Sequence, residues 1–229
     1  MALEGGYQNQ VWRAEDVVVR VERASPESLV WEHAVVAYFA GRLDEVKAPI
    51  EATDGSTFVA CDDFLVSVWP YVSGVPARRR YEPHAVAVAE LVRRLHDAAR
   101  EWSGPQRPGA SAVPGTGARG PIHGDVCRGN VLMRRGRIVG LIDWEESWVD
   151  LLDYELANAV WQFCCSKREH DFDRRLARSM LEAYGSDLEP DDLVPLILTR
   201  LRYERDVWGA ESDEPYRRHL RRSIEKLDG

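Results

Sequence analysis

The sequence HGDVCRGN (residues 123–130) places the acidic side chain Asp125 five residues before the amide side chain Asn130. The motif Ile142-Asp143-Trp144 follows after a predicted turn and supplies a second carboxylate. Transfer of a phosphoryl group to a hydroxyl uses a carboxylate that positions the hydroxyl and accepts its proton. Magnesium that bridges nucleotide phosphates needs hard oxygen ligands, which an amide and a carboxylate provide. The two segments therefore predict a phosphoryl-transfer site, with Asp125 as catalytic base and Asn130 and Asp143 as Mg²⁺ ligands.

The catalytic loop of protein kinases is written H-R-D-x-x-x-x-N, and residues 123–130 match it with Gly124 in place of the arginine. The two segments together resemble the aminoglycoside phosphotransferase and choline kinase-like family, whose loop reads H-G-D-x-x-x-x-N and whose metal strand ends in I-D-W or I-D-F. That family shares the protein-kinase fold but phosphorylates small molecules. The resemblance therefore implies an α+β, bilobal protein-kinase-like fold, a phosphate donor that is ATP or GTP, and a small hydroxylated acceptor.

The resemblance also implies how the chain is divided. We expect a small N-terminal nucleotide-binding lobe over residues 1–70, with a five-stranded antiparallel sheet and one helix. A hinge over residues 71–75 then leads to a larger, mainly helical C-terminal lobe over residues 76–229. The larger lobe would carry the catalytic loop and the acceptor site.

Composition limits the kinds of partner. The chain has 229 residues, of which 45% are hydrophobic and 30% charged, as expected of a soluble globular protein with a core. Its net charge of -8 argues against a nucleic-acid partner, which would require clustered lysine and arginine. The negative charge has two interpretations, simple solubility or an acidic cleft that attracts a cationic substrate.

The cysteines and the apolar runs bear on the compartment. Cys61, Cys127, Cys164 and Cys165 show neither C-x-x-C pairing nor zinc-site spacing, so we expect free thiols in a reducing environment. No charged-then-apolar leader opens the sequence, and no apolar run reaches the length of a membrane span. These features predict a cytoplasmic protein without a membrane partner.

The N-terminal segment predicts a hairpin, with strands at residues 11–13 and 17–21 joined by a turn at residues 14–16. In the family, such a glycine-bearing hairpin covers the nucleotide phosphates, and its second strand carries a cation that holds them. Gly6 and Arg20 stand at these positions. The family more often has lysine there, and arginine keeps the charge on a planar, forked head. A surface arginine on an edge strand is the alternative.

Ser25-Pro26 predicts the start of a helix, with serine as N-cap and proline at the first helical position, and Gly41 predicts its end. Glu32 lies in the middle of this helix. In kinase-like folds a glutamate at such a place pairs with the strand cation, so we expect Glu32 to orient Arg20. Glu27 is the alternative partner, and a solvated glutamate is the alternative role for Glu32.

Three further short strands should complete the sheet: residues 50–52, 57–61 and 64–68. The stretch from Trp69 to Gly74 then occupies the place of the family's hinge, whose backbone groups bind the edge of adenine. Trp69 and Tyr71 are therefore the predicted nucleotide contacts, while Pro70 removes one N–H from the stretch. The alternative is an ordinary transition from strand to turn.

The middle of the chain should frame the catalytic loop. A helix is expected from Pro83 to about Arg100, followed by a Gly-, Pro-, Ala- and Ser-rich loop at residues 103–121. That loop is either a flap near the substrate or a tolerated insertion. Two short strands at residues 130–133 and 138–142 form a predicted hairpin that sets the metal ligands side by side. A further helix should begin at Asp150 as its N-cap.

The last third of the chain is helical by pattern, with breaks at Gly185-Ser186 and around Gly209-Ala210. Three residues there lie about one turn apart and form the most pocket-like set for the acceptor: Tyr203, Glu204 and Trp208. Packing between helices is the alternative role for this set. Carboxylates also gather in this region, although most charges on a helix surface are solvated.

The remaining roles follow from position in the loop. His123 is expected to support the loop by hydrogen bonding. Arg128 has two possible roles, to neutralise charge on the transferring group or to brace the turn. The acidic balance favours a polar or cationic antibiotic of the aminoglycoside kind as acceptor, with a metabolite such as choline or homoserine as the alternative. A nucleotide-binding pseudokinase and a metal-dependent hydrolase using His123, Asp125 and Asp143 are the other functional classes.

Overall fold

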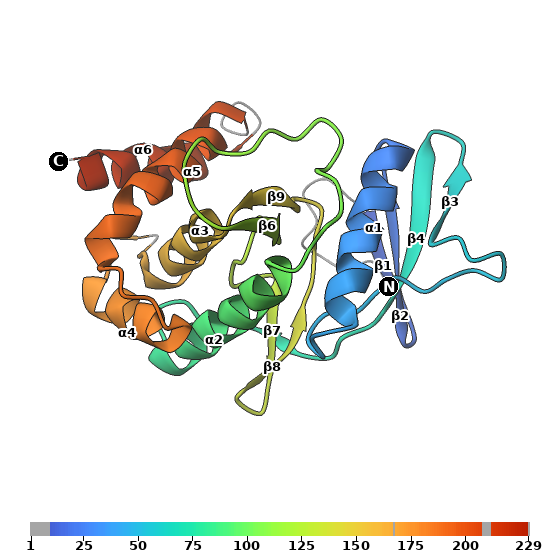
Figure 1. Cartoon of the computed structure of the whole chain (residues 1–229), viewed down its shortest axis with the longest axis horizontal. Helices are drawn as coiled ribbons and strands as arrows, with labels where there is room; N and C mark the ends of the chain where they lie inside the picture. The colour runs from blue at the N-terminus through green and yellow to red at the C-terminus, as the bar shows by residue number, and fades with distance from the viewer. Residues whose placement is uncertain (1–9, 167, 208–211, 229) are drawn as a thin grey trace.

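The computed structural model describes residues 10–166, 168–207 and 212–228 and combines six α-helices with several small sheets over those ranges. A sheet with one long helix against it stands at one end of the molecule, and a larger group of helices forms the rest (Figure 1). The mixture of helix and sheet agrees with the expected α+β class. Gly6, Trp208 and the predicted break at Gly209-Ala210 lie outside the described residues.

The sheet at this end has four antiparallel strands in the order β1-β2-β4-β3. The strands are β1 (Gln10–Ala14), β2 (Val17–Glu22), β3 (Phe58–Cys61) and β4 (Phe64–Pro70). A tight turn joins β1 to β2 as predicted, and its Glu15 takes a positive φ of 54°. Because β2 pairs with β1 on one side and β4 on the other, Arg20 lies on an inner strand and not on an edge.

The prediction of five strands is wrong for residues 50–52, which form no strand. The amide of Ile50 donates to the carbonyl of Val68 on β4 at 2.7 Å, so the segment does touch the sheet. The amide of Ala52 instead donates to Ser56 within the same loop at 2.8 Å. The chain therefore turns away after one contact, which is too few to make a ladder.

Helix α1 (Pro26–Ala40) begins and ends where the sequence predicts. The Ser25 hydroxyl accepts the amide of Ser28 at 3.1 Å, and the helix closes at Gly41. Its buried residues are spread around the helix because the sheet covers one side and the larger lobe the other. The Phe39 ring lies 5.2 Å from that of Trp144, which brings α1 against the segment that carries Asp143.

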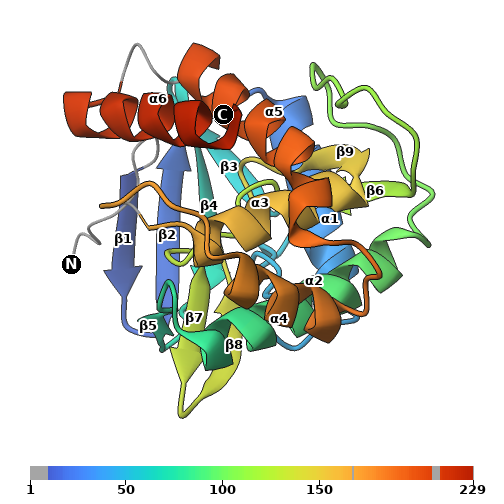
Figure 2. The ribbon, with the colours of Figure 1, turned by 90° about the vertical axis from the view of Figure 1, so that its left-hand side faces the viewer.

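The larger lobe packs five α-helices and two small sheets. The helices are α2 (Glu82–Ala99), α3 (Leu152–Cys164), α4 (Arg174–Tyr184), α5 (Val194–Val207) and α6 (Glu214–Asp228), with the short 3-10 turn η1 (Pro190–Leu193) before α5. The strands are β5 (Val75–Pro76), β6 (Arg119–Ile122), β7 (Val131–Arg134), β8 (Arg137–Leu141) and β9 (Trp148–Leu151). Figure 2 shows α4, α5 and α6 on the side of the lobe away from the four-stranded sheet. Among the described helices, none combines the length and hydrophobicity needed to cross a bilayer.

Helix α3 starts later than predicted, because Asp150 belongs to β9 and is not the N-cap. The Asp150 carboxylate is fully buried and accepts the Trp148 indole N–H at 2.6 Å and the amide of Val113 at 3.0 Å. Arg119 on the neighbouring strand β6 reaches the same carboxylate at 3.1 Å. Asp150 therefore ties the β6–β9 pair to the preceding loop.

The close approach of two backbone segments beside the β6–β9 pair explains why glycine stands at position 124 of the predicted catalytic loop. Gly124 follows β6 and has a φ of +86°, a conformation that side chains rarely adopt. A Cβ atom at this position would lie 1.9 Å from the carbonyl oxygen of Glu146. The loop thus passes too close to the segment after Asp143 for any residue but glycine.

We predict that Gly124→Ala lowers the free energy of unfolding by about 2–5 kcal/mol, since backbone strain and a backbone clash add. Gly55→Ala is the matched control, because Gly55 has a similar φ of +81° with no atom within 4 Å of the added Cβ. It should cost only about 1–2 kcal/mol of strain. Denaturant unfolding of both variants measures the difference, and equal losses would contradict the proposed clash.

Candidate active site

The predicted base and one predicted metal ligand are in direct contact. The Asn130 amide nitrogen Nδ2 donates to the Asp125 carboxylate at 2.9 Å and to the Asp125 backbone carbonyl at 3.0 Å. Within the loop, the amide of Cys127 donates to the Asp125 carbonyl at 2.8 Å. Because Nδ2 of Asn130 is used in this way, its side-chain oxygen Oδ1 is the atom left to bind a cation.

Asp143 stands beside this loop. The amide of Ile142 donates to the Asn130 carbonyl at 2.9 Å, which joins the end of β8 to the start of β7 and sets the two predicted metal ligands close together. Asp143 takes a φ of +67°, a costly conformation for a residue with a side chain. Burial raises the pKa of Asp143, and Asp125 adds to the effect, while His123 and Arg20 oppose it.

The donor set suits a divalent cation. Asp143 and Asn130 offer hard oxygens, and a nearby second carboxylate makes a cation favourable there. Across the described ranges, no three His, Cys, Asp or Glu side chains gather closely enough to hold a metal ion by themselves. A cation at Asn130 and Asp143 would therefore complete its shell with phosphate and water oxygens, which is the usual arrangement for Mg²⁺.

His123 fixes the loop as predicted. Its Nδ1 accepts the amide of Asp125 at 3.2 Å, and its Nε2 hydrogen-bonds to the carbonyl of Ile142 at 2.9 Å. The ring also lies 4.6 Å from that of Trp144. Because the backbone uses both ring nitrogens, the contacts favour a supporting role for His123 over metal ligation in a hydrolase.

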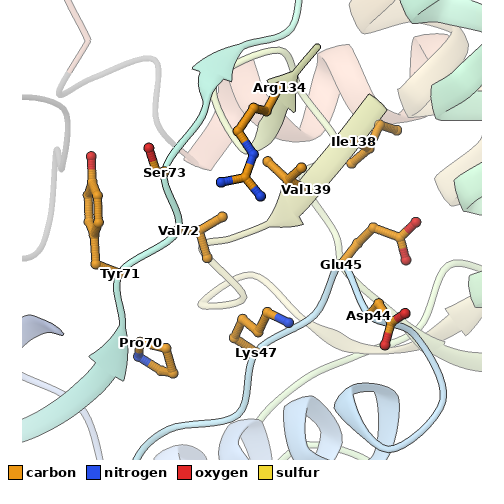
Figure 3. Close-up of a pocket in the computed structure, with 10 residues that line it drawn as sticks. All are labelled: Asp44, Glu45, Lys47, Pro70, Tyr71, Val72, Ser73, Arg134, Ile138 and Val139. Atoms are coloured by element: carbon orange, nitrogen blue, oxygen red, sulfur yellow. The ribbon is translucent and has the colours of Figure 1, made fainter. Parts of the chain in front are cut away.

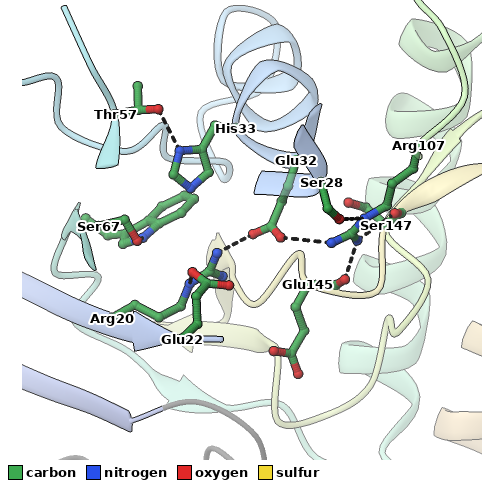
Figure 4. Close-up of polar contacts among 11 residues, drawn as sticks. Arg20, Glu22, Ser28, Glu32, His33, Thr57, Ser67, Arg107, Glu145 and Ser147 are labelled. Atoms are coloured by element: carbon green, nitrogen blue, oxygen red, sulfur yellow. Dashed lines mark hydrogen bonds and ion pairs between the residues drawn. The ribbon is translucent and has the colours of Figure 1, made fainter. Parts of the chain in front are cut away.

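Arg20 is buried and paired with Glu32, as predicted from the helix. The guanidinium contacts Glu32 at 2.6 Å and Glu22 at 2.7 Å (Figure 4). Although burial opposes its charge, these carboxylates hold the pKa of Arg20 above its usual range. The alternatives of a surface arginine and of pairing with Glu27 are wrong, because Arg20 is only 7% exposed and Glu27 faces solvent.

The sequence reasoning missed Glu22 as a partner of Arg20. The sequence contained a signal for this pair, because Glu22 follows Arg20 by two positions at the end of the predicted strand, and residues two apart on a strand share a face. Burial raises the pKa of Glu22, and Glu32 adds to the effect, while Arg20 opposes it. The guanidinium is thus held between two carboxylates, one from its own strand and one from α1.

Trp69 and Tyr71, the predicted nucleotide contacts, support Arg20 and the sheet. The Arg20 guanidinium carbon lies 5.1 Å from the centre of the Trp69 ring, whose indole N–H donates to Ser67 at 2.8 Å. The amide of Tyr71 donates to the carbonyl of Asp16 at 2.8 Å, so it is already used within the N-terminal lobe. The Tyr71 ring packs under the guanidinium of Arg13, 3.6 Å away.

A hollow of about 480 Å³ lies beside the hinge (Figure 3). Its described lining comes from the loop after α1, the hinge and the β7–β8 hairpin: Asp44, Glu45, Lys47, Pro70, Tyr71, Val72, Ser73, Arg134, Ile138 and Val139. The Tyr71 side chain points away from the hairpin residues in Figure 3. Neither Asp125 nor Asp143 is in this described lining.

A second hollow, of about 390 Å³, lies next to the segment that follows Asp143. Its described lining comes from the end of β2, the loop before β6, that segment and α5: Glu22, Arg23, Ala24, Arg107, Pro108, Gly109, Ala110, Glu145, Glu146, Ser147, Trp148 and Tyr203. We call it the carboxylate hollow, because Glu22, Glu145 and Glu146 all line it. Of the predicted acceptor residues, Tyr203 lies here.

Glu204, also predicted as an acceptor residue, is not among the described residues that line the carboxylate hollow. It is 3% exposed and accepts hydrogen bonds from Arg200 at 2.7 Å and from the Tyr216 hydroxyl at 2.6 Å. Glu204 stands one turn after Arg200 on the inner face of α5, so helical spacing turns it inward while Tyr203 faces outward. These contacts agree with packing, the alternative role, and contact of Glu204 with an acceptor stays a prediction.

Arg200 and Glu146 are functional candidates that the sequence reasoning missed. Arg200 is 1% exposed and donates to the Glu146 carboxylate at 3.0 Å. Burial raises the pKa of Glu146 to about 8; Arg200 opposes the shift, and Asp125 adds to it. The spacing of Arg200 and Glu204, one turn apart on α5, was the only sequence signal for a role of Arg200. Nothing in the sequence linked Arg200 to Glu146.

The Arg128 side chain is exposed. Its backbone carbonyl accepts the amide of Ala77 at 3.1 Å, which anchors the loop to the chain after the hinge. The bracing therefore comes from the backbone of this residue. Action of its guanidinium on a transferring group stays a prediction.

Glu155 on α3 supports the loop through a hydrogen bond to its backbone. Its buried carboxylate accepts the amide of Gly124 at 3.0 Å and contacts His96 Nε2 at 3.0 Å. Asn158, on the same helix, donates to the carbonyl of Gly124 at 3.2 Å. Burial opposes ionisation of the Glu155 carboxyl. The hydrogen bond and the charge interaction with His96, together with His123 and the Gly124 amide, nevertheless keep the pKa of Glu155 below its ordinary value.

Fold and site together define a class of protein: a protein-kinase-like fold with an H-G-D-x-x-x-x-N loop and an Ile-Asp-Trp segment beside it. The model of the phosphotransferase enzyme family (APH) matches residues 1–113 and 110–193. The chain belongs to this family.

Similar proteins agree with the fold. The structure of amicoumacin kinase hAmiN, in complex with AMP-PNP and Ca²⁺, superposes with a TM-score of 0.79 at 13% identity, covering 100% of this chain and 87% of that one. The microcompartment-associated aminopropanol kinase gives a TM-score of 0.75 at 17% identity, covering 100% and 88%. Homoserine kinase of Acidiphilium cryptum (strain JF-5) is 24% identical over 71% of this chain. The aligned region spans 61% of that relative's length.

We predict that Glu155→Ala lowers the free energy of unfolding by about 3 kcal/mol or more, because it leaves His96 and the Gly124 amide without their buried partner. Glu90→Ala, an exposed glutamate on α2, should change it by about 0.5 kcal/mol or less. Denaturant unfolding compares the two variants. Equal stability of both would show that Glu155 does not support the loop.

Proposed function

We propose that this protein transfers the γ-phosphoryl group of ATP, or of GTP, to a hydroxyl of a small molecule. The observation that carries the proposal is the contact of Asn130 with Asp125 beside Asp143, within electrostatic reach of the buried Arg20. Two carboxylates, one amide and one cation at such a place match the needs of phosphoryl transfer. Family membership supports the same reaction.

Each residue has a part in this reaction. Asp125, held by the amide of Asn130, would orient the acceptor hydroxyl and take its proton. Arg20, held by Glu32, would balance the charge of the phosphates. Mg²⁺ at Asn130 and Asp143, when bound, would neutralise the oxygens of the nucleotide. Arg128 would sit where it can meet charge on the transferred group.

The nucleotide would lie between an N-terminal lobe (residues 1–70) and a C-terminal lobe (residues 76–229), along the hinge at residues 71–75. Ile142 offers an apolar surface there, since it is 38% exposed and directly precedes Asp143. The amide of Tyr71 is used by Asp16, so adenine would meet other backbone groups of the hinge. Gly6 would cover the phosphates, as the family resemblance implies.

The carboxylate hollow is the proposed acceptor site. Glu146 lies close enough to Asp125 for the two charges to interact, so an acceptor seated there would reach the base. In the described lining, three glutamates outnumber two arginines, Arg23 and Arg107, and together with the exposed Tyr203 they favour an acceptor that carries an ammonium group. Aminopropanol and homoserine, named for two similar kinases, are both amino-bearing alcohols. We therefore propose an amine-bearing alcohol, either an aminoglycoside-like antibiotic or a smaller metabolite.

Two variants separate the base from the metal ligand. We predict that Asp125→Asn keeps nucleotide affinity within about twofold but lowers turnover by about two to four decades, the usual share of a positioned base. Asp143→Asn should instead abolish the Mg²⁺-dependent part of nucleotide binding. Calorimetric titration with and without Mg²⁺, and nucleotide consumption with an acceptor panel, measure the two effects.

The exposed Asp153→Asn serves as the control and should leave both quantities unchanged. Wild-type turnover in Asp125→Asn would remove this residue as the base. Nucleotide binding without turnover of any acceptor by the wild-type protein would favour the pseudokinase class.

Glu146 makes the acceptor assignment testable. We predict that Glu146→Gln raises KM for amine-bearing acceptors by about tenfold, the weight of one charge-assisted contact, and leaves KM for neutral polyols and for ATP unchanged. Since only the ionised carboxylate attracts an ammonium group and the pKa of Glu146 is raised to about 8, wild-type KM for amines should fall as pH rises through 8. The variant should lack the change near pH 8 and keep only the one that Glu145, whose pKa burial raises to about 7, contributes. A variant with the wild-type pH profile would place the amine elsewhere.

A further inference from the structure

The segment between α2 and β6 is anchored to both lobes by side-chain and backbone hydrogen bonds. The indole N–H of Trp31 on α1 donates to the carbonyl of Pro105 at 2.8 Å. The side-chain amide of Gln106 pairs with the backbone of Val149 on β9, at 2.7 Å for the donated and 2.8 Å for the accepted bond. We call residues 105–107 the strap, because they join α1 to β9.

The last residue of the strap, Arg107, makes the contacts that matter for the site. Its Nε donates to the Ser28 hydroxyl at 2.7 Å, and its Nη2 lies 3.5 Å from the Glu32 carboxylate, both on α1 (Figure 4). Its Nη1 donates to the backbone carbonyls of Glu145 and Ser147, at 2.9 Å for the latter. The side chain is 15% exposed, so water screens these contacts little.

These contacts connect the two halves of the proposed nucleotide site. Glu32 binds Arg20 through its other oxygen, so Arg107 and Arg20 hold one carboxylate between them. Glu145 and Ser147 follow Asp143 in the chain. Arg107 thus fixes the position of the phosphate-binding cation of one lobe relative to the metal-ligand segment of the other.

The contacts require an arginine. Four acceptors surround the side chain, and guanidinium presents five N–H donors in a fixed plane. A lysine would keep the charge but has only three donors on a single nitrogen, so it can satisfy the Glu32 side or the carbonyl side but not both. The control position is Arg100, an exposed arginine just before the strap that contacts Asp97 on its own helix.

We propose that Arg107 is a positioning residue for nucleotide binding: through Glu32 and the Glu145 and Ser147 carbonyls, it sets Arg20 against Asp143. The inference rests on the proposed function, since it concerns the same nucleotide site. It assigns Arg107 a role in affinity for the Mg²⁺–nucleotide complex, in addition to its place in the lining of the carboxylate hollow.

The test measures the dissociation constant of the Mg²⁺ complex of a fluorescent ATP analogue, with no acceptor present, together with the melting temperature. We expect Arg107→Ala to weaken binding by about tenfold, Arg107→Lys to be intermediate, and Arg100→Ala to match wild type. Ethylguanidine should restore part of the affinity of Arg107→Ala. In a Glu32→Gln background, Arg107→Ala should weaken binding by only about twofold, since both changes act on one contact.

The outcomes separate this inference from the proposed function. If the wild-type protein does not bind the Mg²⁺–nucleotide complex, the proposed function fails. If it binds and Arg107→Ala binds equally well, only the role of Arg107 fails. A loss that is additive with Glu32→Gln, insensitive to ethylguanidine and equal for the lysine and alanine variants would also overturn it, because it would mark Arg107 as a general stabiliser.

Discussion

The hydrogen bond from the Asn130 amide to the Asp125 carboxylate, 2.9 Å long, is the interaction on which the rest of the site depends. It orients the proposed base and frees the amide oxygen for a cation. The surrounding elements hold this one contact in place: β6 leads into the loop, the β7–β8 hairpin leads out of it, and Glu155 of α3 binds its Gly124 amide. Replacing glycine there would drive the loop away from the Glu146 carbonyl.

The second requirement is that the two lobes keep a fixed relation. Arg20 belongs to the sheet, whereas Asp143 belongs to the larger lobe, and in the proposed reaction the nucleotide would need both of them side by side. Glu22 and Glu32 hold the buried Arg20 guanidinium within its own lobe. These two contacts do not set the distance between Arg20 and Asp143 in the larger lobe. The contacts of α1 with Trp144 and with the strap supply that restraint.

Local signals made part of this account predictable from the sequence. The caps of α1, the hairpin around Arg135-Gly136 and the loop motif each depend on residues close together in the chain, and all three are found as expected. The failures involve contacts between distant segments. Asp150 is a residue type that often caps helices, but its carboxylate binds the amide of Val113 and the side chain of Arg119 instead. Arg107 binds Glu32, which lies 75 residues away in the sequence. Glu204 lies inward because α5 buries the face it shares with Arg200.

The most direct test of the central claim is a crystal structure of the protein with Mn²⁺ and a non-hydrolysable ATP analogue, in which anomalous scattering locates the cation. The account predicts a Mn²⁺ peak in contact with the side-chain oxygens of Asn130 and Asp143, and a phosphate within reach of Arg20. A cation bound away from both side chains, or a nucleotide whose phosphates lie out of reach of Arg20, would contradict it.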